Sequence, residues 1–564
     1  MFLSAVAEVM SIGSVIPFIA VITDPDKMNE FSLLINVLDY FDISETQDAV
    51  LFFTSVFIIL AFISGIIRIF YIWTQSRLTQ LITADFGISA FKKSLYQPYL
   101  VHIKRNSSEV VSTIFVKLNR LSYKVILACF TVISSSIIVL SVFFAFLYID
   151  FLRTISLFFS FASIYILFTL LFNSPLKRSS ITLSKEQDKT VKILQESFGG
   201  IRDILIDGTH ELYIKLYSRS ELLLKKTISN VEFMALSPRY IIETLGITIF
   251  AVFCSYSVLQ GIDTSYILPV LGSVVVAAVK LLPYVQQAYA GISDIKGHIE
   301  VVEDVLLLLD QEEPKSSNLE ATTKQSKERF IFNDKIELNE VCFSYNSNEK
   351  NILNNIDITI PMGSRVGIIG QTGSGKSTLI DILMGLLLPD SGSFKIDGKE
   401  LNSTNQYLWR KKVVHVPQNI FLSDLSIKDN IVFGYSDSQE DFAKIVSASK
   451  KANIHQHVES LDHGYETLVG ERGVKLSGGQ RQRIGIARAL YRDPEILFLD
   501  EATNALDDHT EELIMKSLYD FNANMTLIMV AHRKTTLKHC SIIIELEQGA
   551  IKRIGSYKDI IGKY

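Results

Sequence analysis

The sequence is poor in cysteine and in charge. Its 564 residues include four cysteines, Cys129, Cys254, Cys342 and Cys540, and no two of them form a C-x-x-C pair. This scatter supports neither a disulfide scaffold nor a zinc site. Charged residues make up only 20% of the chain, against 48% hydrophobic residues. That composition excludes intrinsic disorder and is too apolar for an ordinary soluble protein of this length.

An excess of positive charge is also missing. The 55 Lys and Arg residues are outnumbered by 60 Asp and Glu residues, which gives a formal net charge of −5. A chain of this kind has no general attraction for nucleic acid, so no nucleic-acid partner is expected. No Lys or Arg precedes the first hydrophobic run, which therefore lacks the basic segment of a secretory signal.

What the sequence has in abundance is long apolar runs. They cover residues 1–22, 50–73, 125–149, 154–173, 240–260 and 265–290. Each is close to the roughly 20 residues that cross a bilayer as a helix. Buried core helices are the alternative, but residues 50–67 contain no charged side chain. We therefore predict a multi-pass membrane protein in contact with membrane lipids, with an all-α domain of six spans over residues 1–310.

The charges between the runs predict an orientation. Residues 23–49 hold one basic and seven acidic residues, whereas residues 74–124 and 174–239 are rich in Lys and Arg. Because basic connections stay in the cytoplasm, the first loop is expected outside and the other two inside, as in a bacterial cytoplasmic membrane. The two inner connections are long and have helical periodicity, so the spans are expected to continue into the cytoplasm as helices.

The second half of the chain has a different pattern. A charge-rich stretch without apolar periodicity, residues 311–329, predicts a linker. From residue 330 to residue 564, short β-rich runs alternate with helical ones, which predicts an α/β domain.

A phosphate-binding loop opens this α/β domain. The apolar run 366–369 leads directly into the loop, which consists of Gly370, Gln371, Thr372, Gly373, Ser374, Gly375, Lys376, Ser377 and Thr378. Its glycines let backbone N–H groups surround phosphate oxygens, Lys376 can reach the β- and γ-phosphates, and the Ser377 hydroxyl suits Mg²⁺. A strand before the loop and a helical run after it are the context that a P-loop requires.

Two further motifs carry chemistry. The apolar run 496–499 ends in Asp500, expected to hold Mg²⁺, and Glu501, expected to deprotonate the attacking water. The alternative for this pair is an ordinary solvated loop. Between the two sites, Ser477, Gly478, Gly479 and Gln480 precede a basic helical run and form a candidate anion site. The alternative there is a plain serine N-cap.

Together these motifs resemble the ATP-binding cassette (ABC) superfamily over the whole second half of the chain. Residues 370–377 look like the Walker A loop, residues 476–480 like the signature motif, and residues 496–501 like the Walker B strand with its catalytic glutamate. The resemblance also assigns Gln418 to the Q-loop, in the catalytic and Mg²⁺-binding set, and Asp507 to the D-loop. Asn504 departs from the serine usual in this D-loop.

Two aromatic side chains complete the resemblance. His532 takes the place of the switch histidine that contacts the γ-phosphate, and Tyr345 that of the aromatic residue stacked on adenine. Without the family match, an exposed strand tyrosine is an equally good reading of Tyr345.

Six spans followed by one cassette resemble a half-transporter of the type IV ABC exporters. The resemblance implies ATP and Mg²⁺ as cofactors and a partner, either a second copy in a homodimer or a related half-transporter. It also places the tips of the cytoplasmic helix extensions near residues 117–124 and 206–214. Exporters begin with an amphipathic helix before the first span, whereas this sequence starts inside the span, so an upstream segment is expected.

The first outer loop points to a substrate class. Met28, Phe31, Leu34, Ile35 and Leu38 fall on one face of a helix that could lie on the outer membrane surface. With residues 15–19, this loop resembles the flippases of lipid-linked oligosaccharides in bacterial N-glycosylation and their O-antigen and capsule relatives. A solvated loop is the alternative for the segment.

A peptide or drug exporter and an ATP-gated channel are the alternative functions of the protein, and an intact Glu501 argues against the channel.

Charged residues within the spans are functional candidates. Lys280 lies deep in the last span and is the substrate candidate, because it could face the phosphate of a lipid-linked glycan. The alternative is an ion pair with Glu243 or Glu8. Arg68, near the inner end of the second span, is expected to extend to the lipid headgroups.

Overall fold

The structure is a computed structural model that describes residues 1–23, 46–149, 151–259, 264–312, 332–346, 350–434, 442–521, 524–531, 533 and 535–562. The chain forms two compact units. The first unit consists of residues 1–97 and 105–312, and the second of residues 98–104 and 313–564. Each unit is described by itself.

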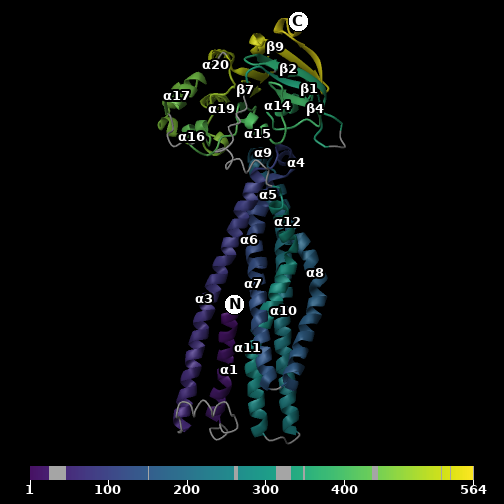
Figure 1. The fold of residues 1–564 in the computed structure, drawn as a ribbon, viewed down its shortest axis with the longest axis vertical. Coiled ribbons are helices and arrows are strands. Elements are labelled where there is room, and N and C mark those ends of the chain that lie inside the picture. The colour runs from purple at the N-terminus through teal and green to yellow at the C-terminus, as the bar shows by residue number, and fades with distance from the viewer. Residues whose placement is uncertain are drawn as a thin grey trace. The chain divides into compact units, whose positions relative to one another are not determined.

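Long helices make up the first unit (Figure 1). They are α1 (Phe2–Thr23), α3 (Thr46–Leu95), α7 (Leu127–Ile149), α8 (Phe151–Gly199), α10 (His210–Leu259) and α11 (Thr264–Gly297), followed by the shorter α12 (Ile299–Leu309). The six predicted apolar runs fall within these six long helices, apart from a residue or two at the ends. Among the described residues, Gln47–Leu95 and Ser107–Phe144 are long and apolar enough to cross a membrane, and Phe2–Ser11 is a shorter apolar helix.

The first inner connection turns earlier than predicted. After α3 the chain passes through α4 (Tyr99–Lys104), which belongs to the second unit, and returns to the first unit at α5 (Ser107–Val111). Asn106 caps α5, with its Oδ1 accepting the backbone N–H of Ser108 at 3.1 Å. The expected tip at residues 117–124 is wrong, because these residues continue the helix through η2 (Ser112–Lys117), α6 (Leu118–Leu121) and η3 (Ser122–Ile126). Two residues of the sequence indicate this earlier turn: Pro98, which interrupts a helix, and Asn106, which caps the next one.

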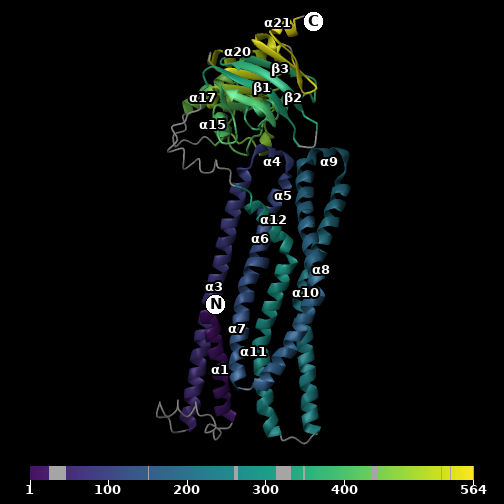
Figure 2. The ribbon, with the colours of Figure 1, turned by 45° about the vertical axis from the view of Figure 1, so that its right-hand side comes forward.

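The second inner connection is built around one short helix. α9 (Ile201–Asp207) lies between Gly200 and Gly208, where α8 and α10 meet (Figure 2). Gly208 has a φ of +63°, a left-handed conformation that glycine adopts without strain. The stretch expected at this tip, residues 206–214, begins in α9 and continues into α10.

A proline in α10 shows how the long helices are joined. Pro238 has no N–H to donate to the carbonyl of Met234, four residues earlier. The hydroxyl of Tyr289 in α11 donates to this carbonyl oxygen at 3.3 Å, and Nε2 of Gln286 donates to the carbonyl of Ala235 at 3.1 Å. Side chains of α11 therefore satisfy carbonyl groups next to the proline and tie α11 to α10.

The second unit contains two sheets. The antiparallel sheet has the order β2 (Leu353–Pro361), β1 (Lys335–Phe343), β4 (Ser391–Ile396) and β5 (Lys399–Glu400). The larger sheet has the order β10 (Ala550–Gly555), β9 (Ile542–Glu547), β3 (Arg365–Gly370), β8 (Thr526–Val530), β7 (Ile496–Asp500) and β6 (Val413–Val416). Its neighbouring strands are parallel except for β9 and β10.

Besides α4, the second unit contains eight α-helices among its described residues. They are α14 (Lys376–Leu383), α15 (Gln406–Arg410), α16 (Ile427–Val432), α17 (Phe442–Lys451), α18 (His455–Glu459), α19 (Gly478–Tyr491), α20 (Asp508–Phe521) and α21 (Tyr557–Ile560).

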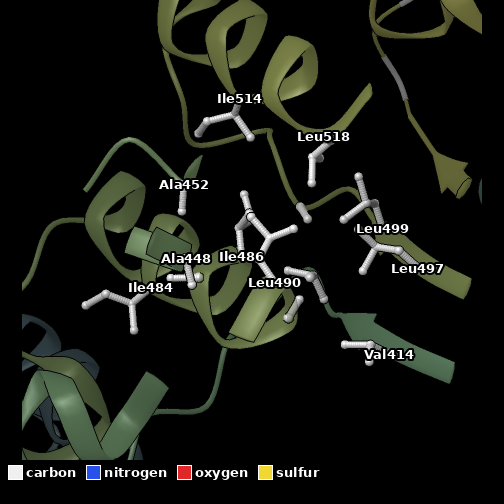
Figure 3. Packing of buried hydrophobic residues seen from close by; sticks show 14 of the residues in the cluster. Val414, Ala448, Ala452, Ile484, Ile486, Leu490, Leu497, Leu499, Ile514 and Leu518 are labelled. Carbon is white, nitrogen blue, oxygen red and sulfur yellow. The ribbon is translucent and has the colours of Figure 1, made fainter. Parts of the chain in front are cut away.

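Strand β7 shows why its sequence is apolar without interruption. Ile496 and Phe498 pack in a core with β1, β2 and α14, whereas Leu497 and Leu499 pack on the opposite face. On that face they meet Ile486 and Leu490 of α19 and Ile514 and Leu518 of α20 (Figure 3). A parallel strand buried on both faces has no polar positions to alternate with apolar ones. The predicted order of an all-α unit followed by an α/β unit is confirmed.

Candidate nucleotide site

The order of the larger sheet brings the predicted site residues to one edge. Val530 in β8 pairs with Asp500 on one side and with Ile368 on the other. Since the strands are parallel, the carboxyl ends of β3, β8, β7 and β6 lie at the same edge. Gly370 of the phosphate-binding loop is the last residue of β3, Asp500 is the last residue of β7, and Gln418 follows β6 by two residues. Ligands of open α/β sheets bind at that edge.

The phosphate-binding loop depends on its glycines. A Cβ on Gly370 would lie 2.4 Å from the carbonyl oxygen of Leu546, and Gly373 and Gly375 have φ values of +81° and +98°. Nζ of Lys376 donates to the carbonyl oxygens of Gly370 at 2.8 Å and Gln371 at 2.9 Å, so the ammonium group lies on the loop itself.

Two observations indicate that this loop can bind a phosphate. The hydroxyl of Ser374 is buried and has no hydrogen-bond partner among the described residues. Gly375 caps α14, so the first N–H groups of this helix point toward the loop. A phosphate would supply the acceptor oxygens that these donors need.

The acidic end of β7 is held by its neighbours. The backbone N–H of Glu501 donates to the carbonyl of Val530 at 3.0 Å, and its φ of +50° is unusual for a residue other than glycine. Nε2 of Gln418 donates to Oε2 of Glu501 at 2.6 Å. The structure therefore joins the predicted glutamine and the predicted general base, which are separated by 83 residues in the chain.

Sequence analysis missed one acid near this site. Asp381 lies in α14, and burial, with a smaller contribution from the charge of Asp500, raises its pKa to about 6. The effect of Asp500 means that the two carboxyl groups are close in space. No spacing rule linked them, because α14 and β7 are more than a hundred residues apart.

Tyr345 lies beside the phosphate-binding loop. It follows the end of β1, and its hydroxyl lies 3.2 Å from Oγ1 of Thr378. Its ring meets the ring of Phe343 edge to face, with 5.2 Å between the centroids. The reading as an exposed strand tyrosine is wrong, because the residue is partly buried and lies outside the strand.

The short helix α4 belongs to the same unit. Leu100 packs against the core that contains Val366 and Leu379. Burial raises the pKa of Tyr99, and the negative charge of Asp381 and the Tyr345 hydroxyl add to this shift. Thus α4 lies near Asp381 and Tyr345.

The signature residues form a helix cap. Oγ of Ser477 accepts the backbone N–H of Gln480 at 3.2 Å, and Oε1 of Gln480 accepts the N–H of Ser477 at 2.7 Å. The N-cap reading is therefore correct as local structure, and it leaves Gly478 and Gly479 in the first turn of α19. A Cβ on Gly479 would lie 3.1 Å from the carbonyl oxygen of Ala505, so this turn packs against the predicted D-loop.

Asp507 ends that D-loop and precedes α20. Its carboxylate accepts the backbone N–H of Thr510 at 2.9 Å and the hydroxyl of the same residue at 2.8 Å. These hydrogen bonds lower the pKa of Asp507. His532 lies outside the described residues.

The candidates in the membrane domain are less completely described. The side chain of Lys280 and the whole segment 28–41 lie outside the described residues. The carboxylate of Glu8 accepts the hydroxyl of Ser64 at 3.1 Å, and the Arg68 guanidinium lies 5.5 Å from the ring centroid of Tyr284.

Comparisons with known proteins agree with this architecture. The family model described as the ABC transporter transmembrane region matches residues 3–265, and the model described as ABC transporter matches residues 353–504. The chain belongs to the ABC transporters. A bacterial Atm1-family ABC exporter with ATP bound has the same fold, with a TM-score of 0.78, 21% identity and coverage of 99% of this transporter and 96% of that chain.

Relatives in sequence have several functions. The heterocyst differentiation ATP-binding protein HepA of Nostoc is 33% identical over 69% of this transporter and 62% of its own length. The α-hemolysin translocation ATP-binding protein HlyB of Escherichia coli O157:H7 is 42% identical over 40% of this transporter and 32% of its own length. The match to this transporter thus spans less than two thirds of either relative.

Proposed function

We propose that this transporter is a half-molecule that hydrolyses ATP to export its substrate and works with a second copy of itself or a related half-transporter. The observation that carries the proposal is the hydrogen bond between Gln418 and Glu501, at the sheet edge that also holds the phosphate-binding loop. A base joined to a second polar side chain beside a phosphate-binding loop is the arrangement needed to direct water at a terminal phosphate.

The proposal assigns a task to each residue that binds the nucleotide or activates the water. The backbone N–H groups of residues 370–378 and Nζ of Lys376 bind the β- and γ-phosphates, and Tyr345 stacks on the adenine. Glu501 takes the proton of the attacking water, Gln418 orients that water, and His532 contacts the γ-phosphate.

The Mg²⁺ site is proposed on oxygen ligands. The described residues contain no cluster of three or more His, Cys, Asp and Glu side chains that could hold a metal alone. Ser377, Gln418 and Asp500 would supply oxygen ligands, with the phosphates of ATP completing the set, as is usual for Mg²⁺. Bound there, the ion would neutralise the charge that develops on the phosphates.

We propose that two cassettes pair, because the signature residues of one cassette would then bind the ATP held by the other. Ser477 and Asp507 are exposed in the described structure, which leaves them open to a second cassette. The family arrangement places the signature of one cassette on the ATP held by the other, so that ATP closes the pair and hydrolysis reopens it.

The test of the ATPase uses the full chain in lipid nanodiscs. We expect Mg²⁺-dependent ATP hydrolysis that disappears in Lys376→Ala, and particles that contain two chains. Single-chain particles with full activity would overturn the pairing, and activity that survives in Lys376→Ala would overturn the site.

For the substrate, we propose a lipid-linked oligosaccharide or a related amphipathic lipid. Support comes from the amphipathic spacing of residues 28–38 and from Lys280, whose charge would suit a lipid phosphate. A peptide is the second candidate, because one relative is named for α-hemolysin translocation.

A flipping assay in proteoliposomes separates the two candidates. With a fluorescent lipid-linked oligosaccharide as probe, Lys280→Ala is expected to lose transport, Lys280→Arg to keep it, and both to hydrolyse ATP. Replacing Phe31, Leu34, Ile35 and Leu38 with Ser is expected to lower flipping without lowering basal hydrolysis. Absence of ATP-dependent flipping by the unmodified protein would remove the lipid proposal and favour the peptide.

A further inference from the structure

A buried glutamate lies outside the predicted site residues. Glu511 is in the first turn of α20 and is only 6% exposed. A carboxylate is costly to bury unless its oxygens accept hydrogen bonds or meet a cation. The hydrogen-bond partners of Glu511 therefore indicate which parts of the structure it stabilises.

Both oxygens of Glu511 are engaged. Oε1 accepts the hydroxyls of Thr503 at 2.9 Å and Thr536 at 2.7 Å. Oε2 accepts a guanidinium N–H of Arg533 at 3.1 Å. Arg533 also contacts Asp508 at 2.5 Å, but the Asp508 side chain is 95% exposed, so water screens that second pair.

These partners come from two segments of the chain. Thr503 follows Glu501 by two residues, whereas Arg533 and Thr536 follow strand β8. The same segments are already joined where the N–H of Glu501 meets the carbonyl of Val530. Glu511, which accepts hydrogen bonds from Thr503 and Thr536, is a second connection between these segments. The turn is therefore held at Glu501, through Val530, and at Thr503, through Glu511.

The turn needs such support because its backbone is strained. Glu501 has a φ of +50°, and a residue other than glycine keeps this conformation only when its surroundings impose it. Thr503 is itself buried, at 6% exposure, so its hydroxyl has to find an acceptor inside the protein. Glu511 supplies that acceptor.

We propose that Glu511 is a positioning residue that holds Glu501 in line for the attacking water through Thr503, and couples this turn to the segment after β8 through Arg533 and Thr536. This inference rests on the proposed ATP hydrolysis. Glu511 makes no contact with the nucleotide in this proposal. Its loss is therefore expected to lower kcat and to leave ATP binding intact.

The experiment compares two neighbouring glutamates in the full chain. Glu511→Gln keeps the size of the side chain but replaces one acceptor oxygen with a donor amide. We expect kcat to fall at least about tenfold, while KM for ATP and the affinity for a fluorescent ATP analogue change less than about twofold. Glu512→Gln is the matched control, because Glu512 is next in α20 and is exposed; its kcat should equal that of the unmodified protein.

A second variant covers the case in which Glu511→Gln does not fold. Thr503→Val removes only the hydroxyl that Glu511 accepts, and it should lower kcat in the same selective way. Folded Glu511→Gln with an unchanged kcat would overturn the inference. So would an affinity for ATP that falls by the same factor as kcat in a protein whose melting temperature also falls. If Glu511→Gln does not fold, an unchanged kcat in Thr503→Val would overturn it. Failure of the unmodified protein to hydrolyse ATP would instead overturn the proposed function.

Discussion

Nδ2 of Asn504 donates a hydrogen bond of 2.9 Å to Oε2 of Glu501. The same oxygen accepts Nε2 of Gln418, so two amides from different segments hold one carboxylate oxygen. The serine usual at position 504 in this family has a shorter side chain and no amide. The departure from the family pattern is therefore located at the proposed general base.

The first prediction concerns this base. Glu501→Gln should retain ATP binding and lower turnover by at least about a hundredfold, because an amide cannot accept the proton of the attacking water. Steady-state phosphate release measures the turnover. Glu495→Gln is the control, since Glu495 lies before the opposite end of β7 and pairs with Lys412 at the surface. Near-normal turnover in Glu501→Gln would remove the residue from the mechanism.

The second prediction concerns Asn504. Asn504→Asp keeps the shape but replaces the donor with a negative charge beside Glu501, which should lower kcat about tenfold through repulsion and the lost hydrogen bond. Asn504→Ser should lower it less, because it adds no charge. Equal rates in both variants and the unmodified protein would show that the contact has no part in hydrolysis.

A third prediction concerns the stability of the helical unit. Nζ of Lys117 lies 2.7 Å from a carboxylate oxygen of both Asp188 and Asp304, and its side chain is only 2% exposed. Lys117→Met would leave two partly buried carboxylates without their cation, so it should destabilise the unit by about 3 kcal/mol. Thermal unfolding followed by circular dichroism measures the change.

The control for Lys117 is a surface pair of the same unit. Lys225 and Glu221 form an i,i+4 pair at 3.3 Å in which the Lys225 side chain is 65% exposed. Such pairs contribute less than about 0.5 kcal/mol, so Lys225→Met should leave the melting temperature almost unchanged. Equal effects of the two substitutions would mean that the Lys117 contacts do not stabilise the helices.

The fourth prediction concerns pH. Burial lowers the pKa of His415 in β6 to about 4, and its Nε2 has no hydrogen-bond partner among the described residues. The unfolded chain binds a proton at this histidine near pH 6.5, whereas the folded chain does so only near pH 4. Protons therefore bind the unfolded chain in preference between pH 6.5 and pH 4. The contribution of His415 to the free energy of unfolding is complete above pH 6.5 and is lost as the pH falls toward 4.

The measurement uses the two tryptophans of the chain. In a Trp73→Phe background, the fluorescence of the buried Trp409 reports unfolding of the second unit. His415→Phe should flatten the fall in denaturation midpoint between pH 6.5 and pH 4. Parallel pH curves for the two proteins would assign the dependence to other groups.

The sequence by itself determined the nature of both units and the residues of the phosphate-binding loop. Apolar runs long enough to cross a bilayer are continuous in the sequence, and the loop consists of residues adjacent in the chain. The same is true of the Ser477 cap, whose partners are three residues apart. The sequence is sufficient to predict an interaction wherever the interacting groups are close together in the chain.

Only the tertiary structure decided which distant side chains meet. The strand order β3-β8-β7-β6 brings Gln418 to Glu501, and the packing of α14 brings Asp381 near Asp500. Likewise, α20 carries Glu511 to Thr503, Arg533 and Thr536. These contacts join groups from separate elements, and their formation depends on how strands and helices pack. Hydrophobic periodicity reports which face of an element is buried, but not which neighbour covers that face.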